Sequence, residues 1–138
     1  MERGEMAWGS LPAAAEAEEI EEAIAMLREA GAQGHAGANV NLGNLLDEVR
    51  KDVDGAEQAY RAAIEADPGL ADAHCNLGNL LQRKDVDGAE QAYRAAIKAD
   101  PGFAHAHFNL GVLLDERQDV NGAEQAYRAA IEADPGYA

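Results

Sequence analysis

The chain has 138 residues, of which 47% are apolar and only 5% aromatic, and 26 acidic against 11 basic residues give a formal net charge of −15. This charge argues against DNA, RNA and anionic membranes as partners, because all three attract proteins through basic residues. No apolar run approaches the roughly 18 residues of a membrane span. The single cysteine, Cys75, excludes an internal disulfide, and no signal pattern opens the chain, so we expect a cytoplasmic protein.

The first elements in chain order are a stretch that we expect to be flexible, residues 1–10, and a helix over residues 11–31. Ile20, Ile24 and Leu27 fall on one face of this helix at helical spacing. The tail of the segment, EEAIAMLREA, loosely resembles the phrase GAEQAYRAAI that occurs later in the chain. We therefore interpret the segment as a capping helix that covers the start of the elements after it.

The rest of the chain repeats itself with a period of about 34 residues. The phrase NLGNLL starts at Asn41 and at Asn76, and NLGVLL starts at Asn109, which gives spacings of 35 and 33 residues. A unit of this size that occurs three times indicates stacked helical or mixed units that bury their apolar faces against one another. The units span residues 36–69, 70–102 and 103–138.

Each unit is predicted to contain two helices, which makes the fold all-α. The second helix lies in the shared phrase GAEQAYRAAI and ends at a Pro-Gly pair, because proline cannot continue a helix. Its predicted N-cap is Asp54, Asp87 or Asn121, each followed three residues later by a glutamate in the spacing of a capping box. The first helices are expected over residues 37–48, 72–83 and 105–117.

These repeated residues resemble the tetratricopeptide repeat, whose pattern is W-x2-L-G-x2-Y, then A-x3-F, then P. The second unit carries it as Leu77-Gly78, Ala89-x3-Tyr93 and Pro101, and the other two units match at the same places. The resemblance covers all three units. It implies a right-handed α-solenoid in which the first helices line a concave groove.

One position departs from the family pattern. Asn39, His74 and His107 occupy the place of its tryptophan. We expect weaker packing between helices at these three residues, and the same fold.

The first helices differ from unit to unit, whereas the second helices share the phrase AEQAYRAAI. The resemblance implies that the differing positions face the groove. A constant scaffold with a varied inner wall is typical of a binding array, and relaxed drift at exposed positions gives the same picture. The differing columns are Gly37, Asp72 and His105; Val40, Cys75 and Phe108; Asn44, Asn79 and Val112; and Asp47, Gln82 and Asp115.

One column in the first helices stays constant, and it consists of Asn41, Asn76 and Asn109. A side-chain amide has one acceptor oxygen and two N–H donors, so it can pair with both groups of a peptide bond. The column is similar to the asparagine ladder in the repeat domain of O-linked N-acetylglucosamine transferase, which holds extended peptides by their backbones. Two alternatives stay open: each asparagine bonds a neighbouring helix, or it merely belongs to a duplicated phrase.

A second binding mode in the family is the carboxylate clamp of co-chaperones. Asn44 and Asn76 match two of its residues, but Val40, His105 and Asn109 occupy places that need lysine or arginine. Without those cations the groove is not expected to hold a terminal carboxylate tightly.

The sequence thus predicts an interaction module that binds an extended, basic peptide of a partner protein, with no catalytic residue, metal or cofactor. Amides would hold the peptide backbone, apolar side chains would contact it, and carboxylates would favour lysine or arginine in the ligand. The amides are Asn41, Asn44, Asn76, Asn79 and Asn109; the apolar residues are Val40, Phe108 and Val112; the acids are Asp47, Glu48, Asp115 and Glu116.

Two other interpretations stay open. The last residues, Tyr137 and Ala138, stand where a further first helix would begin, which leaves the apolar face of the last helix uncovered. The chain is then either a fragment or a weak homo-oligomer that stacks through its open C-terminal repeat. As a fragment, it could be the repeat portion of a larger enzyme such as a glycosyltransferase.

Overall fold

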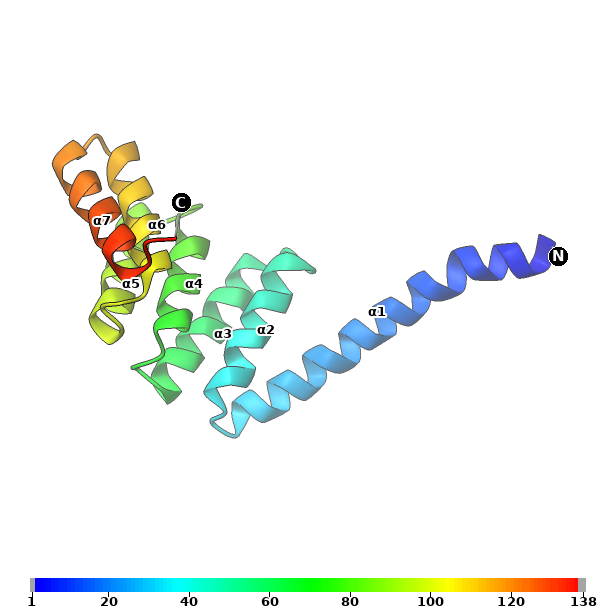
Figure 1. Cartoon of the computed structure of the whole chain (residues 1–138). Helices are drawn as coiled ribbons and strands as arrows, with labels where there is room; N and C mark the ends of the chain where they lie inside the picture. The colour runs from blue at the N-terminus through cyan, green and yellow to red at the C-terminus, as the bar shows by residue number, and fades with distance from the viewer. Residues whose placement is uncertain (1, 137–138) are drawn as a thin grey trace.

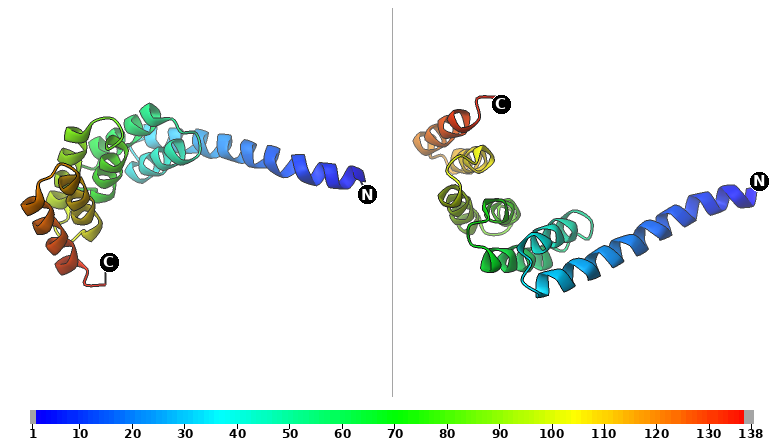
Figure 2. Two further views of the ribbon diagram at one scale, coloured as in Figure 1. Left: turned by 90° about the horizontal axis from the view of Figure 1, so that it is seen from above. Right: turned by 60° about the horizontal axis from the view of Figure 1, so that its bottom comes forward.

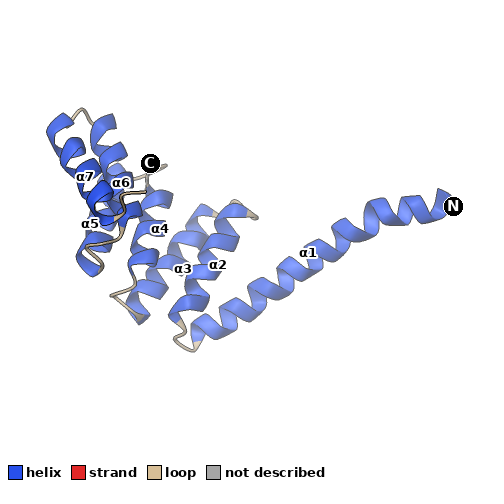
Figure 3. Cartoon of the chain, viewed as in Figure 1, coloured by secondary structure: helices blue, strands red, loops and turns tan. Residues whose placement is uncertain are grey.

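The computed structural model describes residues 2–136 of the chain, with side chains from residue 15 onward. Over this range the chain forms helices and no strands, as the all-α prediction requires (Figure 3). The helices are α1 (Glu2–Ala32), α2 (Ala36–Glu48), α3 (Val53–Ala66), α4 (Ala71–Leu81), α5 (Val86–Ala99), α6 (Ala104–Glu116) and α7 (Val120–Ala133) (Figure 1).

The three repeat units are three helix pairs stacked into a helical-repeat solenoid. α2 packs on α3, α4 on α5 and α6 on α7, and each pair also contacts the next. Successive first helices contact one another, α2 with α4 and α4 with α6. The stack therefore curves, and α2, α4 and α6 lie on the inner side of the curve (Figure 2). We call the surface formed by these three helices the inner wall.

A glycine at the centre of each first helix allows the two helices of a pair to approach closely. A Cβ atom placed on Gly78 would lie 2.6 Å from Cε1 of Tyr93, and one on Gly43 would lie 2.5 Å from Cε1 of Tyr60. Both rings are buried in the core with the leucines of the first helices. The ring thus fills the space that the missing side chain leaves.

The helix at the start of the chain is longer than predicted. α1 begins at Glu2, so it includes most of the stretch that we expected to be flexible, and it ends at Ala32. Extending an existing helix costs less free energy than starting one. This explains why α1 continues toward the N-terminus past residue 11, where the sequence predicted the helix to begin. Ile20 and Leu27 pack against the core beside α2, whereas the N-terminal half projects away from the array (Figure 1).

The predicted N-caps of the second helices are wrong by two residues. The N-caps are Asp52, Asp85 and Asp119, and the carboxylate of Asp85 accepts a hydrogen bond of 3.0 Å from the backbone N–H of Gly88. Asp87 lies one residue inside the helix. The glutamates expected to complete a capping box form ion pairs instead, so the sequence motif is present but serves another contact.

Candidate functional site

The predicted site residues lie on or beside the inner wall, with different exposure. Asn41, Asn79, Glu48, Asp115 and Glu116 are exposed. The other seven are half-buried: Val40, Asn44, Asp47, Asn76, Phe108, Asn109 and Val112.

The amides of the first two units are joined by hydrogen bonds. Oδ1 of Asn44 accepts a hydrogen bond of 2.6 Å from the hydroxyl of Tyr60 and one of 3.3 Å from Nδ2 of Asn76 in the next unit. Burial raises the pKa of Tyr60 to about 12, and Asp47 and Glu48 add to this shift. The hydroxyl therefore keeps its proton at neutral pH and stays a donor, which fixes the orientation of the Asn44 amide.

The same arrangement recurs one unit later. Oδ1 of Asn79 accepts a hydrogen bond of 2.7 Å from the hydroxyl of Tyr93 and one of 2.9 Å from Nδ2 of Asn109. Nε2 of Gln82 donates to the same tyrosine hydroxyl at 2.6 Å. Each bridge links one unit to the following unit, so the pair of bridges connects all three units along the inner wall.

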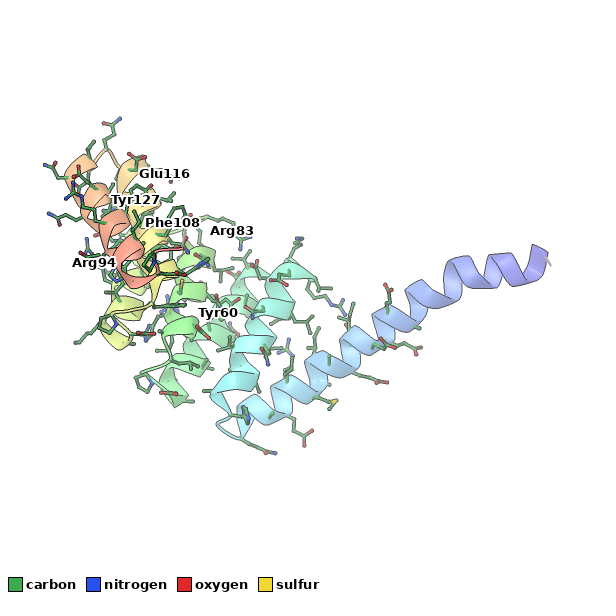
Figure 4. The ribbon with its side chains drawn as sticks, in the orientation of Figure 1. Tyr60, Arg83, Arg94, Phe108, Glu116 and Tyr127 are labelled. Atoms are coloured by element: carbon green, nitrogen blue, oxygen red, sulfur yellow. The ribbon has the colours of Figure 1, made fainter. Side chains whose placement is uncertain are left out.

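In the third unit an apolar contact replaces the polar one. Val112 stands where Asn44 and Asn79 stand in the earlier units, and valine cannot accept a hydrogen bond. The rings of Phe108 and Tyr127 lie 5.6 Å apart at 49° in this unit (Figure 4). At this repeat position the inner wall is consequently polar in its first two units and apolar in the third.

Of the two alternatives left open for the constant asparagines, bonding to a neighbouring helix is observed for Asn76 and Asn109. Asn41 belongs to the first unit, and its side chain makes no hydrogen bond to the described residues. Each donating amide spends one of its two N–H groups on the bridge. The Oδ1 atoms of both amides and the second N–H group of Asn76 make no hydrogen bond to the described residues, whereas Nδ2 of Asn109 also donates to Sγ of Cys75 at 3.8 Å.

The acidic residues of the inner wall differ in whether an ion pair neutralises them. Asp47 accepts an ion pair of 2.7 Å from Arg83 of the next unit. Asp115 and Glu116 form no ion pair with any residue in the described part of the chain. They help, after burial, to raise the pKa of Tyr127, which shows that both carboxylates act on the ring beside Phe108. Exposed Glu48 in the first unit also has no ion pair with a described residue, so carboxylates without an ion-pair partner in this range lie at both ends of the inner wall, two of them in the third unit.

Cys75 was predicted in a column that faces the groove, and this placement is wrong. Its side chain is 2% exposed and belongs to the hydrophobic core. Burial raises the pKa of the thiol to about 11, so the sulfur stays protonated and unreactive at neutral pH. Within residues 15–136, no three histidine, cysteine or carboxylate side chains gather in a way that could hold a metal ion.

The residues at the place of the family's tryptophan have a function that sequence reasoning missed. Nδ2 of Asn39 donates to the carbonyl oxygen of Gly31 at 3.4 Å. Nε2 of His74 and of His107 lie 2.9 and 2.8 Å from the carbonyl oxygens of Pro68 and Pro101. The two histidines bind the turn that leads into their own helix, and Asn39 binds the last turn of the preceding helix, α1. The recurrence of polar residues at one repeat position was the available signal.

Two models of known protein families match the chain. One, described as tetratricopeptide repeat, matches residues 77–138, and the other, described as TPR repeat, matches residues 50–85. The matched residues together extend from 50 to 138, well over half of the chain. A comparison with curated proteins gave no match. Across residues 2–136, no helix is both long and apolar enough to pass through a bilayer.

Several solved structures share this fold. A crystal structure of MamA protein superposes with a TM-score of 0.72 at 24% identity, covering 84% of this chain and 64% of that one. A second MamA structure has a TM-score of 0.68 at 26% identity, covering 72% of this chain and 58% of that one, so the chain spans less than two thirds of either.

A third similar structure is the second TPR of Spaghetti (RPAP3), solved with the HSP90 peptide SRMEEVD. It has a TM-score of 0.68 at 20% identity and covers 77% of this chain and 99% of that one. The helix pairs, the glycine–tyrosine contacts and both family models agree: the chain belongs to the tetratricopeptide repeat family.

Proposed function

We propose that the protein is a non-catalytic, cytoplasmic interaction module that binds an extended peptide segment of a partner protein along the inner wall. The observation that carries this proposal is the pair of amide bridges, because they orient polar groups before any ligand arrives. Preorganised groups lose less entropy on binding than free side chains do.

The bridges determine which atoms a peptide would meet. The oxygens of Asn44 and Asn79 each accept two hydrogen bonds within the protein, so their N–H groups remain for peptide carbonyls. Asn76 keeps an acceptor oxygen and one N–H group for a peptide, and Asn109 keeps its acceptor oxygen, because its amide nitrogen donates to Cys75 as well as to Asn79. Donors and acceptors thus alternate along the wall, as they do along an extended backbone.

The third unit supports a ligand with a basic residue next to an apolar one. Phe108 and Val112 supply the apolar contact, and Asp115 and Glu116 supply negative charge without an ion-pair partner in the described residues. The Spaghetti domain is bound to the peptide SRMEEVD, which contains two glutamates. In this chain the places that need cations for a carboxylate clamp hold Val40, His105 and Asn109, so we expect a ligand of the opposite charge.

A matched pair of labelled peptides tests the charge preference by fluorescence anisotropy: SRMEEVD and its counterpart SRMKKVD, in which both glutamates are lysines. SRMKKVD should bind about 2–30-fold more tightly, since it has two lysines and exposed ion pairs contribute ~0.2–1 kcal/mol each. Raising the salt concentration should reduce the difference.

Asn41→Ala tests the amides, because Asn41 is exposed and bonds no described residue. It should weaken SRMKKVD binding about fivefold, the effect of losing one hydrogen bond worth ~1 kcal/mol, with an unchanged melting temperature. Asn121→Ala, on the exposed first turn of α7, is the matched control and should not change binding. The proposal that the inner wall binds peptides is wrong if binding stays the same when the peptide charge, the salt concentration and the residues Asn41, Asn76 and Asn109 (each to alanine) are changed.

A further inference from the structure

α7 differs from the other second helices in what covers it. Tyr60 in α3 and Tyr93 in α5 are 3% and 0% exposed, and Ile64 and Ile97 pack against the core. Ile131, at the same place in α7, is 53% exposed. The phrase AEQAYRAAI is identical in the three helices, so the difference comes from the neighbour. α4 covers α3 and α6 covers α5, whereas no described helix follows α7.

An ion pair crosses each junction between a second helix and the unit after it. Glu57 of α3 pairs with Lys84 at 2.7 Å, and Glu90 of α5 pairs with Arg117 at 2.8 Å. Glu124 holds the same place in α7, and among the described residues it pairs only within its own helix. The uncovered surface of α7, which we call the α7 face, therefore combines apolar side chains with a carboxylate that lacks the cation of a following unit.

The junction at the other end of the array has the same construction. α1 packs on α2 through Ile24, and Glu21 of α1 pairs with Arg50, which follows α2. Aligning EEAIAMLREA of α1 with EQAYRAAIEA of α3 places Glu21 over Glu57 and Ile24 over Tyr60. α1 thus occupies on α2 the place that a second helix occupies on α4 and on α6.

We propose that, when α1 leaves its place on α2, the α7 face of a second copy of this chain binds α2 in that place. α2 and α4 share the sequence NLGNLL, so this contact reproduces the α3–α4 junction that the molecule already contains. Glu124 of the second copy then pairs with Arg50, which gives the new junction the same carboxylate–cation pair as the others. The contact is head-to-tail and concerns the ends of the array, so it does not depend on peptide binding at the inner wall.

α1 competes with the second copy for the same surface of α2. A short loop tethers α1 to α2, which gives it an effective concentration on the order of millimolar. A solution of the protein at micromolar concentration therefore consists of monomers. Among the side chains that the structure describes, residues 15–19 are exposed and α1 packs against the core only from Ile20 onward, so the contact area of α1 is small. Substitutions in this short stretch release the α2 surface.

Two versions of the 138-residue chain test the proposal by analytical ultracentrifugation. The first, the receptor variant, carries Ile24→Asp and Leu27→Asp to release α1 and Ile131→Asp to block its own α7 face. The second is the unmodified chain, whose α7 face is open and whose α2 is covered. Each alone should sediment as a 14.6 kDa monomer. An equimolar mixture should form a species of twice that mass and nothing larger, because neither chain has both surfaces available.

The proposal is overturned if the mixture stays monomeric while the receptor variant keeps its helical circular dichroism. The α7 face then belongs to a different occupant. It is also overturned if the receptor variant associates with itself, since its α7 face is blocked and the contact is then non-specific. If the receptor variant loses its helical signal, Glu21→Lys with Ile24→Ala and Ile131→Asp replaces it, with the same outcomes.

Exchanging the charges tests the register of the contact. Glu124→Arg in the unmodified chain should weaken the mixed dimer about fivefold, and Arg50→Glu in the receptor variant should do the same. Combining both substitutions should restore the dimer. If the mixed dimer is equally stable in all three combinations, the Glu124–Arg50 pairing is ruled out, and with it the proposed junction.

Discussion

At the scale of single residues, the same amino acid has opposite effects in different places on one helix type. Gly78 in α4 touches the ring of Tyr93, whereas Gly37 at the start of α2 is exposed. Glycine inside a helix costs ~1 kcal/mol relative to alanine. At Gly78 this cost is offset because the missing side chain allows the two helices of the pair to approach closely.

Gly78→Ala is expected to destabilise the protein. Its Cβ would lie 2.6 Å from Cε1 of the Tyr93 ring, and overpacking of this kind costs about 1–3 kcal/mol. This exceeds the ~1 kcal/mol gained in helix propensity, so the net loss should reach up to about 2 kcal/mol. Chemical denaturation followed by circular dichroism measures it.

The control for this prediction is Gly37→Ala, whose Cβ would meet nothing closer than 3.4 Å. It should stabilise the protein by about 0.5–1 kcal/mol, because only the propensity term acts. Equal effects of the two substitutions would show that the tyrosine contact does not govern the choice of glycine.

At the scale of helices, the sequence predicted existence and type well, and boundaries less well. Alanine-rich phrases bounded by Asp-Pro-Gly define the second helices without any structure. The sequence has two aspartates near the start of each of the first two of these helices, and an aspartate and an asparagine near the start of the third. Local sequence could not decide between them, because either can cap a helix. In the structure the first residue of each pair is the N-cap: Asp52, Asp85 and Asp119.

Asp85→Ala and Asp87→Ala separate the cap from its neighbour. Asp85→Ala removes the acceptor for the N–H of Gly88 and should cost about 0.5–2 kcal/mol. Asp87→Ala removes only an exposed ion pair with Arg117 and should cost at most ~1 kcal/mol. Thermal unfolding of the two variants compares them, and a larger loss for Asp87→Ala would return the cap to the position that the sequence suggested.

At the scale of the whole molecule, the described helices make their main contacts within a unit and with the neighbouring unit, so stability is approximately a sum over units and junctions. The central helices have a covered surface on both sides, and the outermost ones do not. α7 lacks a following helix in the described residues and leaves Ile131 exposed. The two ends of the array are therefore its least stabilised parts.

Amide hydrogen exchange should show this as a gradient. α4 and α5 should exchange most slowly, and α7 and the projecting part of α1 should exchange fastest, because local opening there disrupts fewer contacts. Mass spectrometry of exchanged peptides measures the order. Uniform protection from α1 to α7 would mean that the array unfolds as one cooperative unit, without fraying from its ends.

The candidate site was predictable only as a set of positions. The repeat period identified the constant asparagines and the columns that vary. It could not show that Asn76 and Asn109 donate to Asn44 and Asn79 of the preceding unit, because those partners lie some 30 residues apart in the chain. It also placed Cys75 at the groove, and packing against Asn109 and the core buries it.

The sequence by itself determined that the protein is an all-α array of three units, since helix propensity, proline stops and a fixed period all depend on local order along the chain. The tertiary structure alone decided which atoms meet between units. Stacking rotates each first helix against the next, and this rotation orients one amide toward the tyrosine-bound oxygen of another. It also decided how deeply each second helix is buried, because burial depends on a neighbouring helix and not on the phrase AEQAYRAAI that α3, α5 and α7 share.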